Sequence, residues 1–424
     1  MREMKDSGVK WVGEIPSSWK VYKVKQIADS NNDVLPENYE EEQEIDYIEI
    51  GSVTYEHGVR TTKKMKFGNA PSRARRIVHN GDTIISTVRT YLKAIAYIDD
   101  SLADKIVSTG FSVVTPHKDV VAKFLYYALS THSFISNVEA HSVGISYPAI
   151  NNTNLMDLKI VLPMQREQIQ IASYLDAKCS KIDEIIEKQQ AIIEKLKEYK
   201  FSIITEAVTK GINPDVELKD STIDMCEQIP VHWSISQNRY LFSLRDEKNY
   251  KSLEEVRLLS LYTDLGVFPH GEQEERGNKA VKAEGYKVVY ENDIVVNIIL
   301  AWMGAIGRSA YDGVTSPAYD IYKPNENVCS RYYHYLYRTK PFSAECYKYG
   351  RGIMAMRWRT YSSEFKSIKV PVPPYIEQCQ IADYLDSKCE MLDKTIADRN
   401  KAIDKLQEYK KSLIYEVVTG KKEV

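Results

Sequence analysis

A near-copy of one twelve-residue string constrains this chain more than any other feature. Residues 168–179 read QIQIASYLDAKC and residues 378–389 read QCQIADYLDSKC. Aligning 161–210 with 371–420, an offset of 210 (378 − 168), gives 24 identical pairs out of 50. A shorter Ile-Pro-x-x-Trp string ends at Trp19 and again at Trp233, an offset of 214 (233 − 19). A period this long exceeds that of solenoid repeats, so we predict one domain-sized unit present twice, with pseudo-twofold symmetry.

The repeated tails have the periodicity of long helices. Apolar residues recur at alternating steps of four and three, which is the seam of a coiled coil. Prolines precede each segment and glycines follow it, as at helix ends. A helix over about 166–208 would be about 65 Å long. The predicted helix-pairing residues are Leu175, Cys179, Ile182, Ile186, Ile193 and Leu196 in the first copy, and Leu385, Cys389, Leu392, Ile396, Ile403 and Leu406 in the second.

Two alternatives stay open for these helices. They could be core helices of separate domains and not partners of one another. Gln189 and Arg399 interrupt the two seams at equivalent places. Such polar residues either fix the register of a coiled coil or face outward at a crossing.

The segments between the repeats differ in sequence but share a pattern. Gly81 to Ile85 and Asn292 to Val296 each predict a turn followed by a buried strand. Further strands are expected over 46–50 and 111–114, and Phe124–Tyr127 and Tyr332–Tyr335 indicate equivalent aromatic helix faces. The predicted fold is mixed α/β (α+β), with two similar globular domains joined by two long antiparallel coiled-coil helices. The expected segments are 1–165, 166–212, 213–373 and 374–424.

Charge is distributed unevenly. The net charge is −2, so a nucleic-acid partner would have to be served by local charge. Residues 31–58 contain nine acidic and no basic residues, whereas 60–93 contain nine basic residues against one Asp, a net of +8 (9 − 1). A second basic stretch, 339–370, surrounds Trp358. Arginine and lysine mixed with aromatic residues suit contacts with phosphates and bases. The candidate DNA contacts are Arg60, Lys63, Lys64, Lys66, Arg73, Arg75, Arg76, Arg89 and Tyr91, then Trp302, Arg351, Arg357, Trp358 and Arg359.

Each of these candidates also has a plainer interpretation. A run of charge is usually only a solvated face, and an aromatic residue in a loop after a strand is more often part of the core. Tyr91 and Trp302 fall in corresponding loops of the two bodies. The recurrence of basic stretches in both bodies is what favours the binding interpretation.

No catalytic or metal-binding motif is evident. Val372 precedes Pro373-Pro374-Tyr375, where an amino-methyltransferase would need Asp or Asn to hold the target amine. A phosphate-binding G-x-x-x-x-G-K-[ST] loop is missing. The six cysteines form no C-x-x-C pair, which indicates free thiols in a reducing cytoplasm. No membrane span or signal peptide is expected. We therefore predict a non-catalytic chain without a cofactor or metal of its own.

Three motifs together resemble one known family. They are the K-D-S-G-x-x-W-x-G-E-I-P-x-x-W opening (Lys5 to Trp19), the E-Q-x-x-I-A-x-x-L-D helix starts at Glu167 and Glu377, and the E-Y-K…E-x-V-T helix ends. The chain resembles, over nearly its whole length, the specificity subunits of type I restriction–modification enzymes. The second opening departs from the pattern, because 223–226 reads Ile-Asp-Met-Cys.

The resemblance implies a function and partners. Each globular domain would be a target-recognition domain for one half of a bipartite double-stranded DNA site, and the long helices would fix the gap between the halves. Two methyltransferase (modification) subunits and translocating nuclease (restriction) subunits would dock on the chain, in a bacterial or archaeal cytoplasm. Those partners, not this chain, would use S-adenosylmethionine, ATP and Mg²⁺. Because the two bodies differ, the DNA site is expected to be asymmetric.

Two other classes of function remain open on the sequence. The chain could be a coiled-coil scaffold or adaptor that does not bind DNA, or a nuclease or methyltransferase with an unrecognised site. Salt-sensitive, site-specific DNA binding separates the family function from the scaffold. Methyl transfer by the purified chain alone would favour the enzyme.

Overall fold

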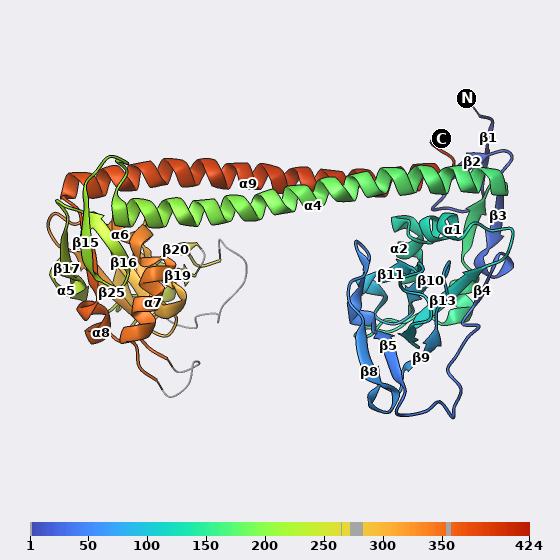
Figure 1. Ribbon diagram of the computed structural model, residues 1–424, viewed down its shortest axis with the longest axis horizontal. Helices are drawn as coiled ribbons and strands as arrows, with labels where there is room; N and C mark the ends of the chain where they lie inside the picture. Colours follow the sequence, from blue (N-terminus) through green and yellow to red (C-terminus); the bar gives the residue numbers. More distant parts are fainter. Residues whose placement is uncertain (1, 264, 272–282, 353–357) are drawn as a thin grey trace. The chain divides into compact units, whose positions relative to one another are not determined.

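The structure, a computed structural model, describes residues 2–263, 265–271, 283–352 and 358–424. The chain divides into two compact units. The first unit contains residues 1–189 and 400–424, and the second contains 190–399. Two long helices, α4 (Gln165–Lys210) and α9 (Tyr375–Val418), are therefore each shared between the units. Each unit combines one globular body with part of α4 and part of α9 (Figure 1).

Both bodies are built on the same four-stranded antiparallel sheet. Its order is β11-β10-β13-β4 in the first unit and β23-β22-β25-β18 in the second. The central strands β10 and β22 are buried along their whole length, as expected for short apolar runs covered on both faces. The bounds are β4 (Ala28–Ser30), β10 (Thr83–Ser86), β11 (Ile95–Tyr97) and β13 (Phe111–Pro116), then β18 (Phe242–Arg245), β22 (Ile294–Asn297), β23 (Ile306–Arg308) and β25 (Tyr319–Pro324).

Among the described residues, a second group of strands is more extensive in the first unit. There the order is β8-β5-β12-β9, whereas the second unit has the pairs β21-β24 and β19-β20. Isolated bridges Val34↔Arg76 and Lys248↔Lys287 occupy equivalent places in the two bodies. The bounds are β5 (Glu44–Ile48), β6 (Val53–Thr54), β7 (Gly58–Val59), β8 (Lys63–Lys66), β9 (Ala74–Ile77) and β12 (Ile106–Ser108), then β19 (Leu259–Tyr262), β20 (Gly266–Pro269), β21 (Lys287–Val289) and β24 (Gly313–Thr315).

Short helices pack beside each sheet. Equivalent helix pairs, α1 with α2 and α6 with α7, follow the last strand of the main sheet in each body. Thr131 and Thr339 cap α2 and α7, each accepting a hydrogen bond from the backbone N–H three residues later. The bounds are α1 (Ala122–Leu129), α2 (His132–Ala140), α3 (Asn152–Met156), α5 (Asn238–Leu241), α6 (Ser330–Tyr337), α7 (Lys340–Tyr349) and α8 (Ser362–Ser367).

The repeated string attaches each body to its long helix. Gln168 is buried, and its side chain accepts from Val121 N–H at 2.8 Å while donating to Pro163 C=O at 2.9 Å. Gln378 does the same with Cys329 N–H and Pro373 C=O, both at 2.9 Å. One buried amide thus satisfies two backbone groups at each junction, because its carbonyl oxygen accepts while its NH2 group donates.

A carboxylate about two turns further along each long helix makes a second attachment. Tyr127 in α1 donates to Asp176 in α4, and Tyr335 in α6 donates to Asp386 in α9, each at 2.7 Å. Burial, and then the hydrogen bond to Asp176, raise the pKa of Tyr127 far above its usual range. These contacts account for the recurrence of L-D in both copies of the string.

The Ile-Pro-x-x-Trp openings close the ends of the long helices. Strand pairs β1 (Met4–Asp6) with β2 (Glu14–Pro16), and β15 (Leu218–Ile223) with β16 (Cys226–Pro230), precede the buried Trp19 and Trp233. Pro16 and Trp19 lie against Gly420 after α9, and Trp233 lies against Gly211 after α4. Strands β3 (Lys20–Lys23) and β17 (Ser234–Gln237) then pair with β14 (Lys159–Leu162) and β26 (Lys369–Val372).

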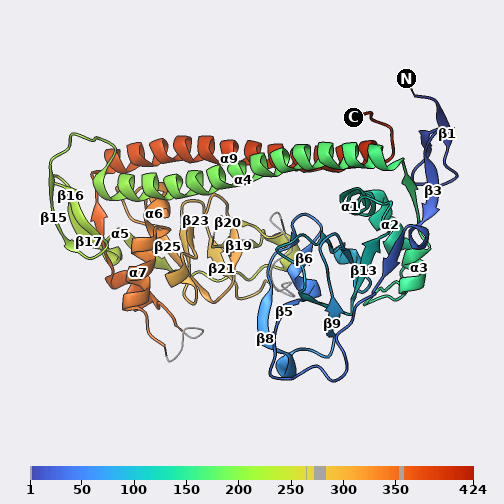
Figure 2. The same cartoon turned by 45° about the vertical axis from the view of Figure 1, so that its right-hand side comes forward.

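Parts of α4 and α9 lie side by side in each unit (Figures 1 and 2). In the first unit Asp183 pairs with Lys410, and in the second Asp393 pairs with Lys200, both at 2.6 Å. These are the same two positions of the repeat, with α4 and α9 exchanged, so the helix segments are antiparallel in each unit. The mixed α/β fold with long helices is confirmed.

The predicted seam residues are shielded from solvent. Leu196, Ile396 and Leu406 are half-buried, and the other nine are buried. Leu385 belongs to the apolar core of the second body, together with Ile381 and Ala382 of α9 and Val208 of α4. The beginning of the seam therefore packs into a globular core, and the later positions lie where α4 and α9 run together. One strand boundary was wrong: β5 ends at Ile48, and a 3-10 turn over Ile50–Ser52 follows it.

Candidate nucleic-acid interface

The predicted basic stretch of the first body is partly neutralised by the acidic stretch before it. Strand β8, which carries Lys63, Lys64 and Lys66, pairs with the acidic strand β5. Lys63 forms an ion pair with Glu49 at 2.6 Å, and Lys66 with Glu42 at 2.5 Å. All three lysines and Arg60 are exposed. The net positive charge predicted from the linear sequence is therefore smaller on the folded surface.

Strand β9 positions three more predicted arginines in different environments. Arg73, just before the strand, is exposed, and no ion pair links it to the described residues. Arg75 lies over the ring of Phe67, with 4.9 Å from its guanidinium carbon to the ring centroid. Arg76 is half-buried, and desolvation lowers its pKa. Arg73 is thus the member of this group best placed to meet a phosphate.

Arg89 and Tyr91 belong to a tight turn after β10. Thr90–Leu92 forms a 3-10 turn, entered through Arg89 at φ 50° and left through Lys93 at φ 52°. A left-handed residue on each side of the 3-10 turn bends the chain sharply, and Tyr91 and Leu92 project outward with exposed fractions of 53% and 42%. The structure therefore places Tyr91 outside the core.

A hairpin over residues 143–149, which sequence reasoning missed, adjoins this turn. Val143 and Ala149 exchange both backbone hydrogen bonds, at 2.8 and 3.0 Å. Ala149 also bridges Val88, and Thr90 Oγ1 donates to Ser142 Oγ at 2.8 Å. The hairpin is sharply turned at Gly144, whose φ is +116°.

The hairpin exposes apolar side chains. Val143, Ile145 and Tyr147 are 79%, 102% and 74% exposed. The signal in the sequence was the string VGISYPA at 143–149, in which apolar residues stand beside Gly144 and Pro148. Such a string resembles a buried strand when its neighbours in the fold are unknown. Backbone hydrogen bonds from Ile150 to Thr87, Thr87 to Gly110 and Thr109 to Arg73 connect the hairpin to the residue just before β9.

The second body has the same construction. Trp302 is the middle residue of a 3-10 turn over Ala301–Met303, between β22 and β23, as Tyr91 is between β10 and β11. Arg351 and Arg359 exchange two backbone hydrogen bonds, and Thr360 N–H donates to Ile298 C=O at 2.9 Å, as Ile150 does to Thr87. Trp302 and Tyr91 therefore do occupy corresponding loops. Arg357 lies outside the described residues.

Different side chains fill this shared frame. Trp358 stacks on Tyr347 with ring centroids 4.9 Å apart and an interplanar angle of 21°, and Trp302 approaches the same ring at 5.9 Å. Arg351 forms an ion pair with Glu364 and lies 5.6 Å over Tyr361. The Nε of half-buried Arg359 has no hydrogen-bond partner among the described residues. We name these two regions the hairpin–turn surfaces. That of the first unit consists of residues 89–92 and 143–149, and that of the second unit consists of residues 300–303, 351, 352, 358 and 359.

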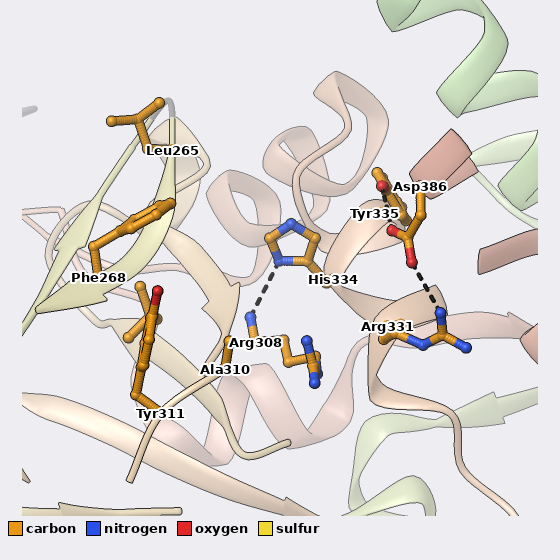
Figure 3. Close-up of a pocket in the computed structure, with 10 residues that line it drawn as sticks. Leu265, Phe268, Arg308, Ala310, Tyr311, Arg331, His334, Tyr335 and Asp386 are labelled. Carbon is orange, nitrogen blue, oxygen red and sulfur yellow. Dashed lines mark hydrogen bonds and ion pairs between the residues drawn. The ribbon is translucent and has the colours of Figure 1, made fainter. Parts of the chain in front are cut away.

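A small pocket in the second unit is a weaker candidate for a binding site. It has a volume of about 200 Å³ and lies between Phe268 and Tyr311 on one side and α6 on the other (Figure 3). Its arginines are already paired, Arg331 with Asp383 and Asp386, and Arg308 with Glu291. Near-complete internal charge pairing leaves little attraction for a charged ligand.

Neither a metal centre nor a membrane span emerges from the described residues. Within 2–263, 265–271, 283–352 and 358–424, no three His, Cys, Asp or Glu side chains gather as metal ligands would. No described helix has the length and apolar character needed to cross a bilayer. The side chains of the hairpin–turn surfaces can bind a ligand by aromatic stacking, by apolar packing and by hydrogen bonds that arginine donates.

Comparison with known proteins finds relatives of one class. Residues 16–198 match the model of a family described as the type I restriction modification DNA specificity domain. The type I restriction enzyme MjaX specificity subunit of Methanocaldococcus jannaschii is 25% identical, over 97% of this chain and 95% of its own length. The MjaIX specificity subunit of the same organism is 27% identical over 44% of this chain and 43% of its own.

Solved structures share the fold. One chain, from a study of complex assembly and conformational transition of the type I R-M system, has a TM-score of 0.73 at 17% identity, over 96% of this chain and 99% of that one. The HsdS subunit from Thermoanaerobacter tengcongensis has a TM-score of 0.54 at 18% identity, covering 96% and 98%. Residues 16–198 therefore match the type I restriction modification DNA specificity domain, and nearly the whole chain is similar to a type I specificity subunit.

Proposed function

We propose that this chain is the DNA-reading subunit of a type I restriction–modification complex, with each unit reading one half of a bipartite, asymmetric site. The observation that carries the proposal is the shared frame of the two bodies. Sheet order, bridges and hairpin–turn surfaces correspond, but the exposed side chains differ. Two equivalent platforms with different surfaces suit two different short DNA sequences.

The remaining parts of the proposal concern the helices and the partners. In this proposal the segments 1–165 and 213–373 are target-recognition domains, and 166–212 and 374–424 are spacers that set the distance between half-sites. Two methyltransferase subunits and the nuclease subunits dock on the chain. They supply S-adenosylmethionine, ATP and Mg²⁺ chemistry, and this chain contributes binding without catalysis.

The decisive experiment is genome-wide methylation mapping in cells that contain the methyltransferase subunit, with and without this chain. We expect a bipartite motif to be methylated only when the chain is present. Methylation that does not change on removal of the chain would contradict the proposal, and so would a symmetric motif. Methyl transfer by the purified chain alone would instead favour an enzyme.

A binding measurement separates this function from a scaffold without a DNA role. With the methyltransferase subunit present, affinity for the mapped site should fall steeply with salt, with a log–log slope of about −0.9 for each phosphate contact. Replacing Arg73 with Ala should reduce that slope by about one contact. Replacing Lys188, an exposed lysine paired with Glu184 on α4, is the matched control and should change neither slope nor affinity. Binding that ignores salt would favour the scaffold.

A further inference from the structure

The two hairpin–turn surfaces differ chiefly in the side chains that their hairpins expose. In the first unit Ile145, Tyr147 and Val143 project from the hairpin, and Tyr91 and Leu92 project from the adjoining turn. The single basic residue of this surface is the half-buried Arg89. In the second unit the hairpin presents Arg351 with half-buried Trp358 and Arg359, and the adjoining turn exposes Leu300 and Met303. Arg351 pairs with Glu364, but its side chain is still 68% exposed.

The exposed apolar residues of the first unit need a partner. A soluble protein rarely leaves several large apolar side chains together at a loop tip without a function. Hydrogen bonds fasten the hairpin to the turn on which Tyr91 stands and connect it to exposed Arg73. Exposed apolar residues connected to the positively charged Arg73 are complementary to a nucleic acid. A nucleic acid has a negatively charged backbone beside a groove that contains methyl groups.

Base pairs differ in what they offer such surfaces in the major groove. Thymine alone presents a methyl group, which apolar side chains contact. Guanine presents two acceptors, N7 and O6, which the forked guanidinium of arginine matches. An apolar surface and an arginine surface therefore favour different bases.

We infer that the two units read DNA by different chemistry: the hairpin–turn surface of the first unit by apolar contact with thymine methyl groups, and that of the second by arginine donation to guanine. This inference rests on the proposed function and deepens it. Ile145 and Tyr147 are assigned as specificity residues of the first unit, and Arg351 and Arg359 as those of the second.

The test alters the DNA one atom or group at a time, after the bipartite motif has been mapped. Deoxyuridine in place of thymidine removes only the methyl group, and 7-deazaguanine removes only the N7 acceptor. Because one buried methyl contributes about 0.8 kcal/mol, we expect each thymine-to-uracil change in one half-site to weaken binding about fourfold. In the other half-site we expect 7-deazaguanine to weaken binding about tenfold.

Protein variants assign each half-site to its unit. In Ile145→Ser, binding should weaken and the uracil substitution should cost nothing further, because the contact is already lost. Both Ile145 and Tyr147 are exposed, so the fold should survive their replacement. Met164→Ser is the matched control, since Met164 is a 73% exposed apolar residue of the same unit outside the surface. It should keep the full uracil effect.

For the second unit, Arg351→Lys and Arg359→Lys keep the charge but lose the fork. We expect the 7-deazaguanine effect to disappear in at least one of them while the salt slope stays the same. Site-specific binding that is insensitive to uracil and to Ile145→Ser would overturn the inference and leave the proposed function standing. Absence of any site-specific binding by the unaltered complex would overturn both.

Discussion

Gln and Asp residues that recur in both copies of the repeat make the same contacts in both units. Gln168 and Gln378 each satisfy two backbone groups where a body meets its helix. Asp176 and Asp386 each accept a tyrosine hydroxyl from the first body helix that follows the sheet. The repeated string is thus an attachment device, which explains how the rest of each body can differ while its junction does not.

Gly420 offers a test of how tightly the opening element closes the end of α9. A Cβ at this position would lie 2.4 Å from Pro16 Cδ, and φ is +74°. Gly211, after α4, has a φ of +82°, but its nearest contact would be 3.3 Å from the carboxylate of Glu377, which can move. Gly420→Ala should cost about 3 kcal/mol and Gly211→Ala about 1 kcal/mol in free energy of unfolding. Equal losses in urea unfolding would contradict the predicted packing.

His334 predicts an acid-sensitive step in stability. Burial, then the charges of Arg338 and Arg308, lower the pKa of His334 to about 3, and its Nδ1 accepts Arg308 N–H at 3.1 Å. In the unfolded chain the imidazole binds a proton near pH 6.5. Its contribution to stability is therefore complete above pH 6.5 and is lost as pH falls toward 3, by up to about 1.4 kcal/mol for each pH unit.

The measurement is urea unfolding at pH 7 and pH 4.5. His334→Asn keeps an acceptor near the Nδ1 position but cannot be protonated, so its loss of stability between these pH values should be smaller than that of the unaltered chain. His57→Asn, at an exposed position, is the control. A pH dependence that His334→Asn leaves unchanged would rule out this assignment.

At the scale of elements, the equivalent ion pairs define the register of α4 against α9. Asp183–Lys410 and Lys200–Asp393 are partly exposed, so each should contribute only about 0.5–1 kcal/mol. Asp183→Lys should destabilise the protein by placing two lysines together, and adding Lys410→Asp should restore most of the loss. The swap Asp393→Lys with Lys200→Asp is the matched control. Without recovery in thermal unfolding of the double variant, the register would be wrong.

The elements that could be predicted from sequence are those with a local or repeated signal. The long helices follow from the spacing of Leu175, Cys179 and Ile182 and from their copies, and β10 and β22 follow from short apolar runs. Ion pairing of β8 with the glutamates that flank β5 could not be predicted, because it depends on which strands become neighbours. The hairpin at 143–149 was missed for the same reason: only its hydrogen bonds with Val88 and Thr90 show that its apolar face points outward.

At the scale of the whole molecule, each compact unit is assembled from chain segments that are distant in sequence. The first unit needs residues 400–424 to complete it, and Arg2 contacts both Glu167 and Glu423. The second unit begins within α4 and ends within α9. Neither unit is therefore built from one simple domain. The first unit includes the end of α9, and the second unit includes the end of α4.

This arrangement makes the long helices the place to change the proposed half-site spacing. We choose 188–194 and 399–405 for deletion, because the numbering of the two ion pairs matches these segments and both ion pairs stay intact. Seven residues are one heptad, so the seams stay in phase. After the deletions, Leu196 lies three residues beyond Ile186, and Leu406 lies three residues beyond Ile396. In the unaltered chain Gln189 and Arg399 hold these places in the seams.

The deletion should shorten the helices by about 10 Å, which equals roughly three base pairs of rise. Methylation mapping of the double deletion should therefore find the same two half-sites with a gap about three base pairs shorter. Binding should also be weaker, because three base pairs of twist rotate one half-site by about 100° relative to the other. Deleting four residues from each helix is the control, since it breaks the seam and should abolish methylation. Half-sites that keep their original gap in the seven-residue deletion would show that the helices do not set the spacing.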